Sequence, residues 1–223
     1  MLIVPDLLTQ AEVSAVVGDL ARQQFADGRG SAAGQAQLAK NNLEFMSDVA
    51  AEGPARVVDQ AVRRNPLVQN YVYPRKLHRI IFNRYEVGMA YGDHLDSPLL
   101  DTGIGGRLRA DLSMTLFLSE PNSYDGGALA IDHSHGTARI KLPAGHAVFY
   151  RSVQVHRVEP ITRGTRLAAV TWVESHVRDQ TDREILYDLA RLLNEVGELK
   201  KPGRMRQTML GVYARLLQRW SEN

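Results

Sequence analysis

Apolar residues follow two different periods along the chain, and the change of period divides the sequence into three regions. In the first third they recur at intervals of three and four, which is typical of amphipathic helices. The segment TQAE has the form of a capping box, with Thr9 and Glu12 three positions apart, and predicts a helix start. Pro54 suits the first turn of another helix, which should end at Asn65 because a proline follows it. We therefore expect residues 1–76 to form a helical segment packed on the core.

The middle region, residues 77–176, has a different character. Short stretches rich in β-branched and aromatic residues are separated by Gly, Pro, Asn and Asp. Roughly seven or eight such stretches follow one another, which is typical of an antiparallel sandwich or barrel. The segments YDGGAL at residues 124–129 and PITRGTR at residues 160–166 look like hairpin connections.

The helical period returns in residues 177–223. TDRE at residues 181–184 has the form of a second capping box, and an amphipathic pattern follows it. KKPG at residues 200–203 separates this helix from a last amphipathic one, which either packs on the core or mediates a homodimer. The fold class is therefore α+β, with a β core between N- and C-terminal helices.

Composition narrows the function classes. The 223 residues are 44% hydrophobic and 23% charged, as in ordinary globular proteins, and the net charge is 27 − 25 = +2. Without a dense Lys/Arg run we expect no nucleic-acid partner. No stretch approaches the roughly 20 apolar residues of a membrane span, and the N-terminus has no signal-peptide pattern, so we expect no membrane partner. Cysteine is absent, which excludes disulfides and thiolate ligands and fits a cytoplasmic location.

The segment YGDHLDSP contains His94 and Asp96 two positions apart. At a strand end the two side chains would point to one face, where a cation could bridge them. An H-x-D pair alone is more often a polar turn than a metal site. A third candidate ligand, His156, follows in the β-rich stretch VQVHRVEP and favours a metal site over a polar turn. Two histidines and one carboxylate form the facial triad of non-haem Fe(II) oxygenases, and zinc could use the same set.

Arg166 follows the turn after His156, and we expect it on the neighbouring strand. If it faces inward, Ala168, Val170 and Trp172 share its face. A guanidinium inside an apolar sandwich needs an anion, and a bidentate carboxylate is its best partner. No acidic residue is evidently placed for this, which points to a ligand carboxylate. The alternative is an arginine that reaches solvent.

Asn83 and Tyr85 alternate on one face of the strand that leads to the H-x-D pair, so either could contact the same ligand. Ordinary strand packing explains them equally well. Tyr91 lies three positions before His94 and should be near the mouth of the site.

The remaining histidines are weaker candidates. His133 and His135 have the same spacing as the H-x-D pair, but they lie in a predicted surface turn. His78, His146 and His176 have no partner pattern, and we expect them at the surface or behind the ligands. Glu174, on the predicted Arg166 face, should lie near a strand end and leaves the assignment unchanged.

Four segments in this order carry a family resemblance: FNRYEVGMAYGDHLD, YDGGALAID, KLPAGHAVFY and VHRVEPITRGTRLAAVTWVES. Together they resemble the Fe(II)- and 2-oxoglutarate-dependent dioxygenases, and more narrowly the bacterial PKHD-type hydroxylases, relatives of the prolyl 4-hydroxylase catalytic domain. FADGRGSAAGQAQLAKNN and SHVRDQTDREILYDLARLL resemble the terminal segments of that family. The resemblance spans nearly the whole chain and implies a jelly-roll (double-stranded β-helix) core.

The resemblance also implies roles for individual residues. His94, Asp96 and His156 would bind iron, Arg166 would bind the distal carboxylate of 2-oxoglutarate, and Tyr85 would contact that cosubstrate. Many such enzymes have a serine two positions after the arginine, whereas Ala168 stands here, so one hydroxyl contact is missing. Several relatives are linked to ascorbate, which keeps the iron ferrous.

The expected activity is hydroxylation of a small-molecule or peptidyl substrate, with succinate and CO2 as co-products. A jelly-roll sensor that binds metal and a 2-oxo acid without turnover is an alternative, as is a zinc hydrolase with the same ligands. A hydrolase has no particular use for Arg166. The Gly-rich segments 26–35 and 96–111 are candidates for lids that shape specificity.

Overall fold

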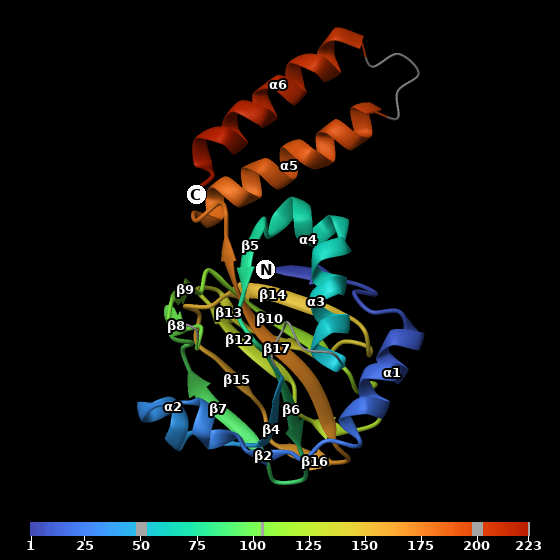
Figure 1. Ribbon diagram of the computed structural model, residues 1–223, viewed down its shortest axis with the longest axis vertical. Coiled ribbons are helices and arrows are strands. Elements are labelled where there is room, and N and C mark those ends of the chain that lie inside the picture. The colour runs from blue at the N-terminus through green and yellow to red at the C-terminus, as the bar shows by residue number, and fades with distance from the viewer. Residues whose placement is uncertain (48–52, 104, 198–202, 223) are drawn as a thin grey trace.

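The segments of the middle region that alternate with period two form strands of two facing antiparallel sheets (Figure 1). The computed structural model describes residues 1–47, 53–103, 105–197 and 203–222. Among these residues the larger sheet has the order β1 (Leu2–Val4), β14 (Ala147–Arg151), β10 (Leu112–Phe117), β17 (Arg166–Ser175), β6 (Ile80–Tyr85), β4 (Leu43–Ser47) and β2 (Ala26–Asp27), and β5 (Pro74–Leu77) also pairs with β17. The smaller sheet has the order β13 (Gly136–Ile140), β12 (Leu129–His133), β15 (His156–Val158), β7 (Ala90–His94) and β3 (Lys40–Asn41). The predicted α+β jelly-roll class is confirmed.

Two short ribbons complete the β structure: β8 (Leu99–Asp101) with β9 (Arg107–Arg109), and β11 (Asp125–Gly126) with β16 (Ile161–Arg163). The second ribbon corrects an expectation. The predicted hairpin segments 124–129 and 160–166 do not each fold back on themselves, because their strands pair with each other. Gly126 permits this close approach, since a Cβ there would lie 2.0 Å from the carbonyl oxygen of Pro160.

The helices are α1 (Gln10–Leu20), α2 (Gly34–Leu38), α3 (Pro54–Arg64), α4 (Pro66–Tyr71), α5 (Gln180–Gly197) and α6 (Gly203–Trp220), with a 3-10 turn, η1, at Gly28–Ser31. The first capping box is present, because the Thr9 side chain accepts from the backbone of Glu12 and the Glu12 carboxylate accepts from that of Thr9. Asn65 ends α3 as predicted, and it also caps α4.

The first third of the chain is less helical than its pattern predicts. β1 pairs with β14 at one edge of the larger sheet, and β4 pairs with β6 near the other. β3 joins the smaller sheet beside β7. These strands are too short to show a period of their own, and their partners are distant in sequence. The division into a helical segment and a core at residue 77 stays a prediction.

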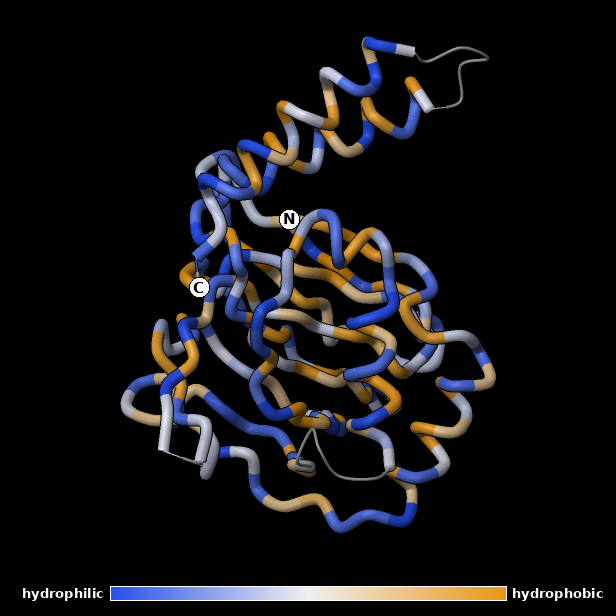
Figure 2. The backbone as a smooth tube through the Cα atoms, turned by 45° about the horizontal axis from the view of Figure 1, so that its top comes forward, coloured by the Kyte–Doolittle hydropathy of each residue, from blue (hydrophilic) through white to orange (hydrophobic). Residues whose placement is uncertain are grey.

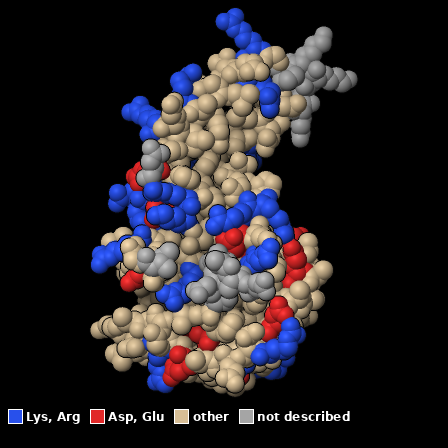
Figure 3. Space-filling view, in the orientation of Figure 1, with Lys and Arg blue, Asp and Glu red and all other residues tan. Residues whose placement is uncertain are grey.

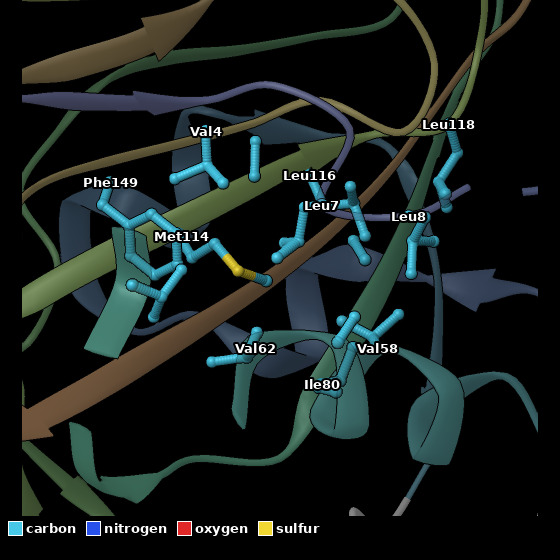
Figure 4. Packing of buried hydrophobic residues seen from close by; sticks show 14 of the residues in the cluster. Val4, Leu7, Leu8, Val58, Val62, Ile80, Met114, Leu116, Leu118 and Phe149 are labelled. Carbon is cyan, nitrogen blue, oxygen red and sulfur yellow. The ribbon is translucent and has the colours of Figure 1, made fainter. Parts of the chain in front are cut away.

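The main core lies between the larger sheet and the helices α1, α3 and α4 (Figure 1). Strand β10 shows how the sheet divides its two faces. Leu112, Met114 and Leu116 belong to the core with the helices, as Figure 4 shows for the latter two, while Ser113 and Thr115 point to the space between the sheets. Burial of the apolar face fixes the strand register, because a slip of one residue would exchange the two faces.

The C-terminal helices form a hairpin that projects away from the sheets (Figure 1). Apolar and polar residues alternate along both helices (Figure 2). At the base of the pair, Tyr213, Leu216 and Trp220 of α6 pack with Leu186 of α5 and with the buried Tyr73 and Val177 of the rest of the protein. The last helix therefore does not cover the core. The separating segment at residues 200–203 lies, except for Gly203, outside the described residues.

The second predicted capping box is wrong. Helix α5 begins at Gln180, and the carboxylate of Asp179 accepts from the backbone N–H of Thr181 at 2.7 Å and of Asp182 at 3.2 Å. Asp179 lies two residues before Thr181 and caps the helix, so Thr181 lies inside the first turn instead of at the cap.

Charged residues of both signs are interspersed on the face shown in Figure 3, where the hairpin carries mainly Lys and Arg. This mixture agrees with the small net charge of +2. Within the described residues, no helix combines the length and the apolar character that crossing a membrane requires.

Candidate active site

The two sheets enclose a cavity of about 490 Å³ between their inner faces. The larger sheet contributes Asn83 and Arg166, the smaller sheet contributes His94 and His156, and η1 with α2 borders one side. Each predicted site residue except Asp96 lies on a strand, and Asp96 follows β7 by two positions.

Strand pairing brings the predicted metal ligands together. β15 pairs with β7 so that His156 lies directly opposite His94. Asp96 turns back toward both, and its Oδ2 lies 3.7 Å from Nε2 of His156. One ligand atom from each of the three residues lies within 4.8 Å of the others. This spacing suits a single ion bound to two imidazoles and one carboxylate.

Backbone carbonyls fix the tautomer of both histidines. Nδ1 of His94 lies 2.8 Å from the carbonyl oxygen of Gly92, and Nδ1 of His156 lies 2.9 Å from that of Gln154. A carbonyl oxygen only accepts, so Nδ1 carries the hydrogen and the Nε2 lone pair is available to a metal. Burial, with a further contribution from His156, lowers the pKa of His94 to about 4, which keeps this imidazole neutral at pH 7.

Neighbouring groups orient the other parts of the triad. Oγ of Ser113 donates to Oδ2 of Asp96 at 2.5 Å and lies 3.1 Å from Oγ of Ser152. The Tyr91 ring stacks on the His94 ring with 3.6 Å between centroids and 11° between planes. Tyr91 thus forms part of the cavity wall beside His94.

Arg166 is 1% exposed and does not reach solvent. Its Nε and Nη2 have no hydrogen-bond acceptor among the described residues. The guanidinium carbon lies 5.4 Å from the centroid of Tyr85 and 5.3 Å from that of Phe117. Two aromatic faces cannot replace a counterion, so this buried charge needs an anion in the cavity.

The expected position of Arg166 relative to His156 is wrong. β15 pairs with β12 and β7 in the smaller sheet, whereas β17 lies between β10 and β6 in the larger one. Between them the chain forms β16 and crosses from one sheet to the other. Arg166 and His156 therefore face each other across the cavity instead of lying on adjacent strands.

Asn83 and Tyr85 lie on the inner face of β6, as the alternation predicts, and Tyr85 lies opposite Arg166. The Oδ1 atom of Asn83 accepts from Nδ2 of Asn42 at 2.6 Å. Burial raises the pKa of Tyr85, so its hydroxyl keeps its proton at neutral pH and can donate to an anion. Ala168 is fully buried two positions after Arg166 and offers no hydroxyl.

Several residues of the site were not found from the sequence. Ser113 could have been found, because it alternates with apolar residues in a predicted strand. Lys40 and Glu44 gave no signal. They form a buried ion pair at 2.5 Å in the cavity wall, with exposed fractions of 7% and 6% for the two residues.

The other histidines lie outside the triad. Both His133 and His135 are exposed, as expected, but His133 is the last residue of β12 and only His135 lies in the turn that follows. His78 is buried, which excludes the first of its two expected positions, the surface, and its Nε2 lies 2.9 Å from the carbonyl oxygen of Asp101. His176 is exposed and His146 is half-buried.

Glu174 accepts from Arg75 at 2.9 Å, away from the cavity. The two candidate lid segments both line the cavity, through Ser31 and Ala33 of one and Ser97 and Leu100 of the other. Their movement stays a prediction.

Residues 80–174, which hold the whole triad and Arg166, match the family model of the 2OG-Fe(II) oxygenase superfamily. The fold and the donor set therefore define a 2-oxoglutarate- and iron-dependent oxygenase. Over 223 residues the chain is 40% identical to a PKHD-type hydroxylase of Paraburkholderia phymatum, with 98% of each chain covered. A PKHD-type hydroxylase of Synechococcus is 39% identical, with 100% and 99% covered. The chain belongs to the PKHD-type hydroxylases.

Solved structures agree on the fold. A Pseudomonas putida prolyl 4-hydroxylase superposes with a TM-score of 0.57 at 21% identity, covering 78% of this chain and 91% of that one. HygX from Streptomyces hygroscopicus, whose structure holds nickel and 2-oxoglutarate, gives 0.54 at 15% identity, covering 78% and 82%.

Proposed function

We propose that the protein hydroxylates a C–H bond of its substrate, with Fe(II) bound by His94, Asp96 and His156 and 2-oxoglutarate bound by Arg166. The observation that carries this proposal is the buried guanidinium of Arg166, which lacks an acceptor and faces the same cavity as the triad. A dicarboxylate that reaches from the metal to Arg166 would satisfy both. Membership of the hydroxylase family supports the same reading.

The residues fit both groups. Two imidazoles whose Nε2 atoms are free and one carboxylate would hold the ion and leave coordination positions for a bidentate 2-oxo acid and oxygen. When bound, iron and 2-oxoglutarate would supply the oxidising chemistry, with succinate and CO2 as co-products.

Around the distal carboxylate, Arg166 would donate two hydrogen bonds, and the Tyr85 hydroxyl could add a third. Asn83 lies next to Ala168 in the sheet register, so its amide could make the contact for which Ala168 has no hydroxyl. Ser113 would hold Asp96 in place by its hydrogen bond to Oδ2. The apolar residues lining the cavity would limit water near the reacting C–H bond.

Further expectations belong to this proposal. Ascorbate would sustain turnover by keeping the iron ferrous. The substrate would be a small molecule or a peptide, the location cytoplasmic, and a homodimer would form through the projecting hairpin. The sensor and the zinc hydrolase remain as alternatives with less support, because the relatives are named hydroxylases and a hydrolase does not use Arg166.

The test is succinate formation from 2-oxoglutarate by the purified protein with Fe(II), with and without ascorbate, and without a prime substrate. We expect slow, iron-dependent turnover that is abolished in Asp96→Ala. Asp93→Ala is the matched control, because Asp93 is an exposed carboxylate on β7, three residues before Asp96, and pairs only with the surface Arg157 among the described residues. Turnover at the wild-type rate in Asp96→Ala would refute the assignment of the triad.

A further inference from the structure

Tyr150 lines the cavity beside the triad but joins none of the three ligands by a hydrogen bond. It belongs to β14, and the residue as a whole is 4% exposed. Among the described residues its hydroxyl makes no hydrogen bond of normal geometry, yet, unlike the hydroxyl of Tyr124, it is not closed off from the cavity. A nearly buried phenol whose oxygen still meets the cavity indicates where a ligand makes a hydrogen bond.

The strand register places Tyr150 at the metal end of the cavity. Tyr150 pairs with Ser113 across β14 and β10, and Ser113 donates to Oδ2 of Asp96. From the smaller sheet, the His156 ring meets the Tyr150 ring at a steep angle, with 5.1 Å between centroids and 68° between planes. The phenol therefore lies beside two of the three metal ligands.

Arg166 lies at the other end of the same wall. Its guanidinium carbon lies 5.3 Å from the ring centroid of Phe117, which is four residues beyond Ser113 along β10. Four strand residues span about 13 Å. The aromatic rings that contact the guanidinium are those of Tyr85 and Phe117, and Tyr150 is not among them. Tyr150 is therefore placed to contact the metal end of a ligand and not its distal carboxylate.

The surroundings of Tyr150 fix its ring and leave its hydrogen free. The ring packs in a cluster of buried apolar side chains that also contains Phe117 and Val148. The hydroxyl of Thr115, on the inner face of β10, lies where it can donate to the phenol oxygen. A phenol keeps its proton at neutral pH, so Tyr150 can still donate this hydrogen to an acceptor in the cavity.

A 2-oxo acid on the metal would offer such an acceptor. It chelates through its 2-oxo oxygen and one oxygen of the adjacent carboxylate, so the second carboxylate oxygen stays free to accept. Hydrogen bonds to an anionic oxygen are stronger than those to a neutral one. The other donors of the larger sheet at this end are engaged or hidden, because Ser113 donates to Asp96 and Nε1 of Trp172 is inaccessible.

We propose that the Tyr150 hydroxyl donates a hydrogen bond to the free oxygen of the carboxylate next to the 2-oxo group, and thereby holds the metal end of 2-oxoglutarate while Arg166 holds the distal end. The inference deepens the proposed function and rests on it. It makes Tyr150 a cosubstrate-binding residue, whichever substrate is hydroxylated.

The experiment measures binding without turnover, by calorimetric titration of 2-oxoglutarate into the Zn(II)-loaded protein. Tyr150→Phe keeps the ring and its contact with His156 and removes only the hydroxyl. We expect the Kd for 2-oxoglutarate to rise roughly 10- to 150-fold, the effect of one hydrogen bond to a charged group, with the Zn(II) affinity unchanged. The matched control is Tyr187→Phe, whose ring packs edge-on against Tyr71 and does not line the cavity, and it should change neither value.

Pyruvate distinguishes the two ends of the cosubstrate, because it has the 2-oxo acid group and lacks the distal carboxylate. Ligand-observed NMR on the Zn(II) form measures its Kd at millimolar concentration. Tyr150→Phe should weaken binding of pyruvate by the same factor as binding of 2-oxoglutarate. Tyr85→Phe, at the Arg166 end, should weaken binding of 2-oxoglutarate alone.

An unchanged Kd for 2-oxoglutarate in Tyr150→Phe would overturn the inference. A loss confined to 2-oxoglutarate, with pyruvate unaffected, would place the hydroxyl at the distal carboxylate and overturn it as well. Failure of the hydroxylase proposal would appear separately, as absent iron-dependent succinate formation by the wild type. Because the binding measurements use zinc, they do not depend on that activity.

Discussion

Replacing Arg166 by methionine should affect stability and cosubstrate binding in opposite directions. Methionine has a similar length and no polar hydrogens, so Arg166→Met removes a buried charge and two donors without acceptors while filling the same space. The ligand-free protein should become more stable, whereas binding of 2-oxoglutarate should become weaker. If Arg166 served only to stabilise the fold, its replacement would lower the stability of the ligand-free protein and leave 2-oxoglutarate binding unchanged.

The magnitudes follow from the contacts. Each unpaired buried donor costs about 1–3 kcal/mol, and the two cation–π contacts with Tyr85 and Phe117 recover roughly 1 kcal/mol each. The expected gain is therefore about 0–4 kcal/mol in the free energy of unfolding, with a midpoint of about 2 kcal/mol. Removing one partner of a buried, hydrogen-bonded charge pair costs about 2–5 kcal/mol, so the Kd for 2-oxoglutarate should rise from about 30-fold to a few thousandfold.

Urea unfolding of the metal-free protein gives the first quantity, and calorimetric titration of 2-oxoglutarate into the Zn(II) form gives the second. Arg163→Met is the matched control, because this exposed arginine pairs with Asp125 and should change neither value by more than about 0.5 kcal/mol. A ligand-free Arg166→Met that is less stable than the wild type and binds 2-oxoglutarate normally would refute the reasoning.

Three further predictions concern the support of the site. Ser113→Ala removes the hydrogen bond to Asp96 and should weaken Zn(II) binding about 10- to 100-fold in a chelator competition, with the fold unchanged by circular dichroism. Gly28→Ala places a Cβ 2.0 Å from Oδ1 of Asn42, and the displaced amide should cost about 1–3 kcal/mol in urea unfolding, whereas Gly30→Ala meets open space and should not. Thr9→Ala removes the cap of α1 and should cost about 1 kcal/mol in the same assay, with unchanged succinate formation; a loss of activity would contradict its purely structural role.

The positions of the triad and of Asn83, Tyr85 and Arg166 in the cavity wall could be anticipated because each depends on local rules. Alternation along a strand assigns faces, and proline, glycine and capping residues mark ends. Such rules also place Asn65 at a helix boundary. They failed at Asp179, where two residues compete for one capping position and the earlier one prevails.

What the local rules could not predict is which strands become neighbours. Arg166 was expected beside the strand of His156, because a turn usually connects adjacent strands, yet the chain crosses to the other sheet. The buried ion pair of Lys40 and Glu44 could not be predicted either, because it too depends on which strands become neighbours. Their spacing of four residues suggests one helix face, whereas Lys40 lies in the smaller sheet and Glu44 in the larger.

This crossing has a chemical consequence. Had Arg166 followed on the strand next to His156, its guanidinium would lie beside the metal ligands, where a positive charge opposes binding of a cation. Placement on the opposite sheet separates the two charges by the width of the cavity, which is the space that a dicarboxylate can fill.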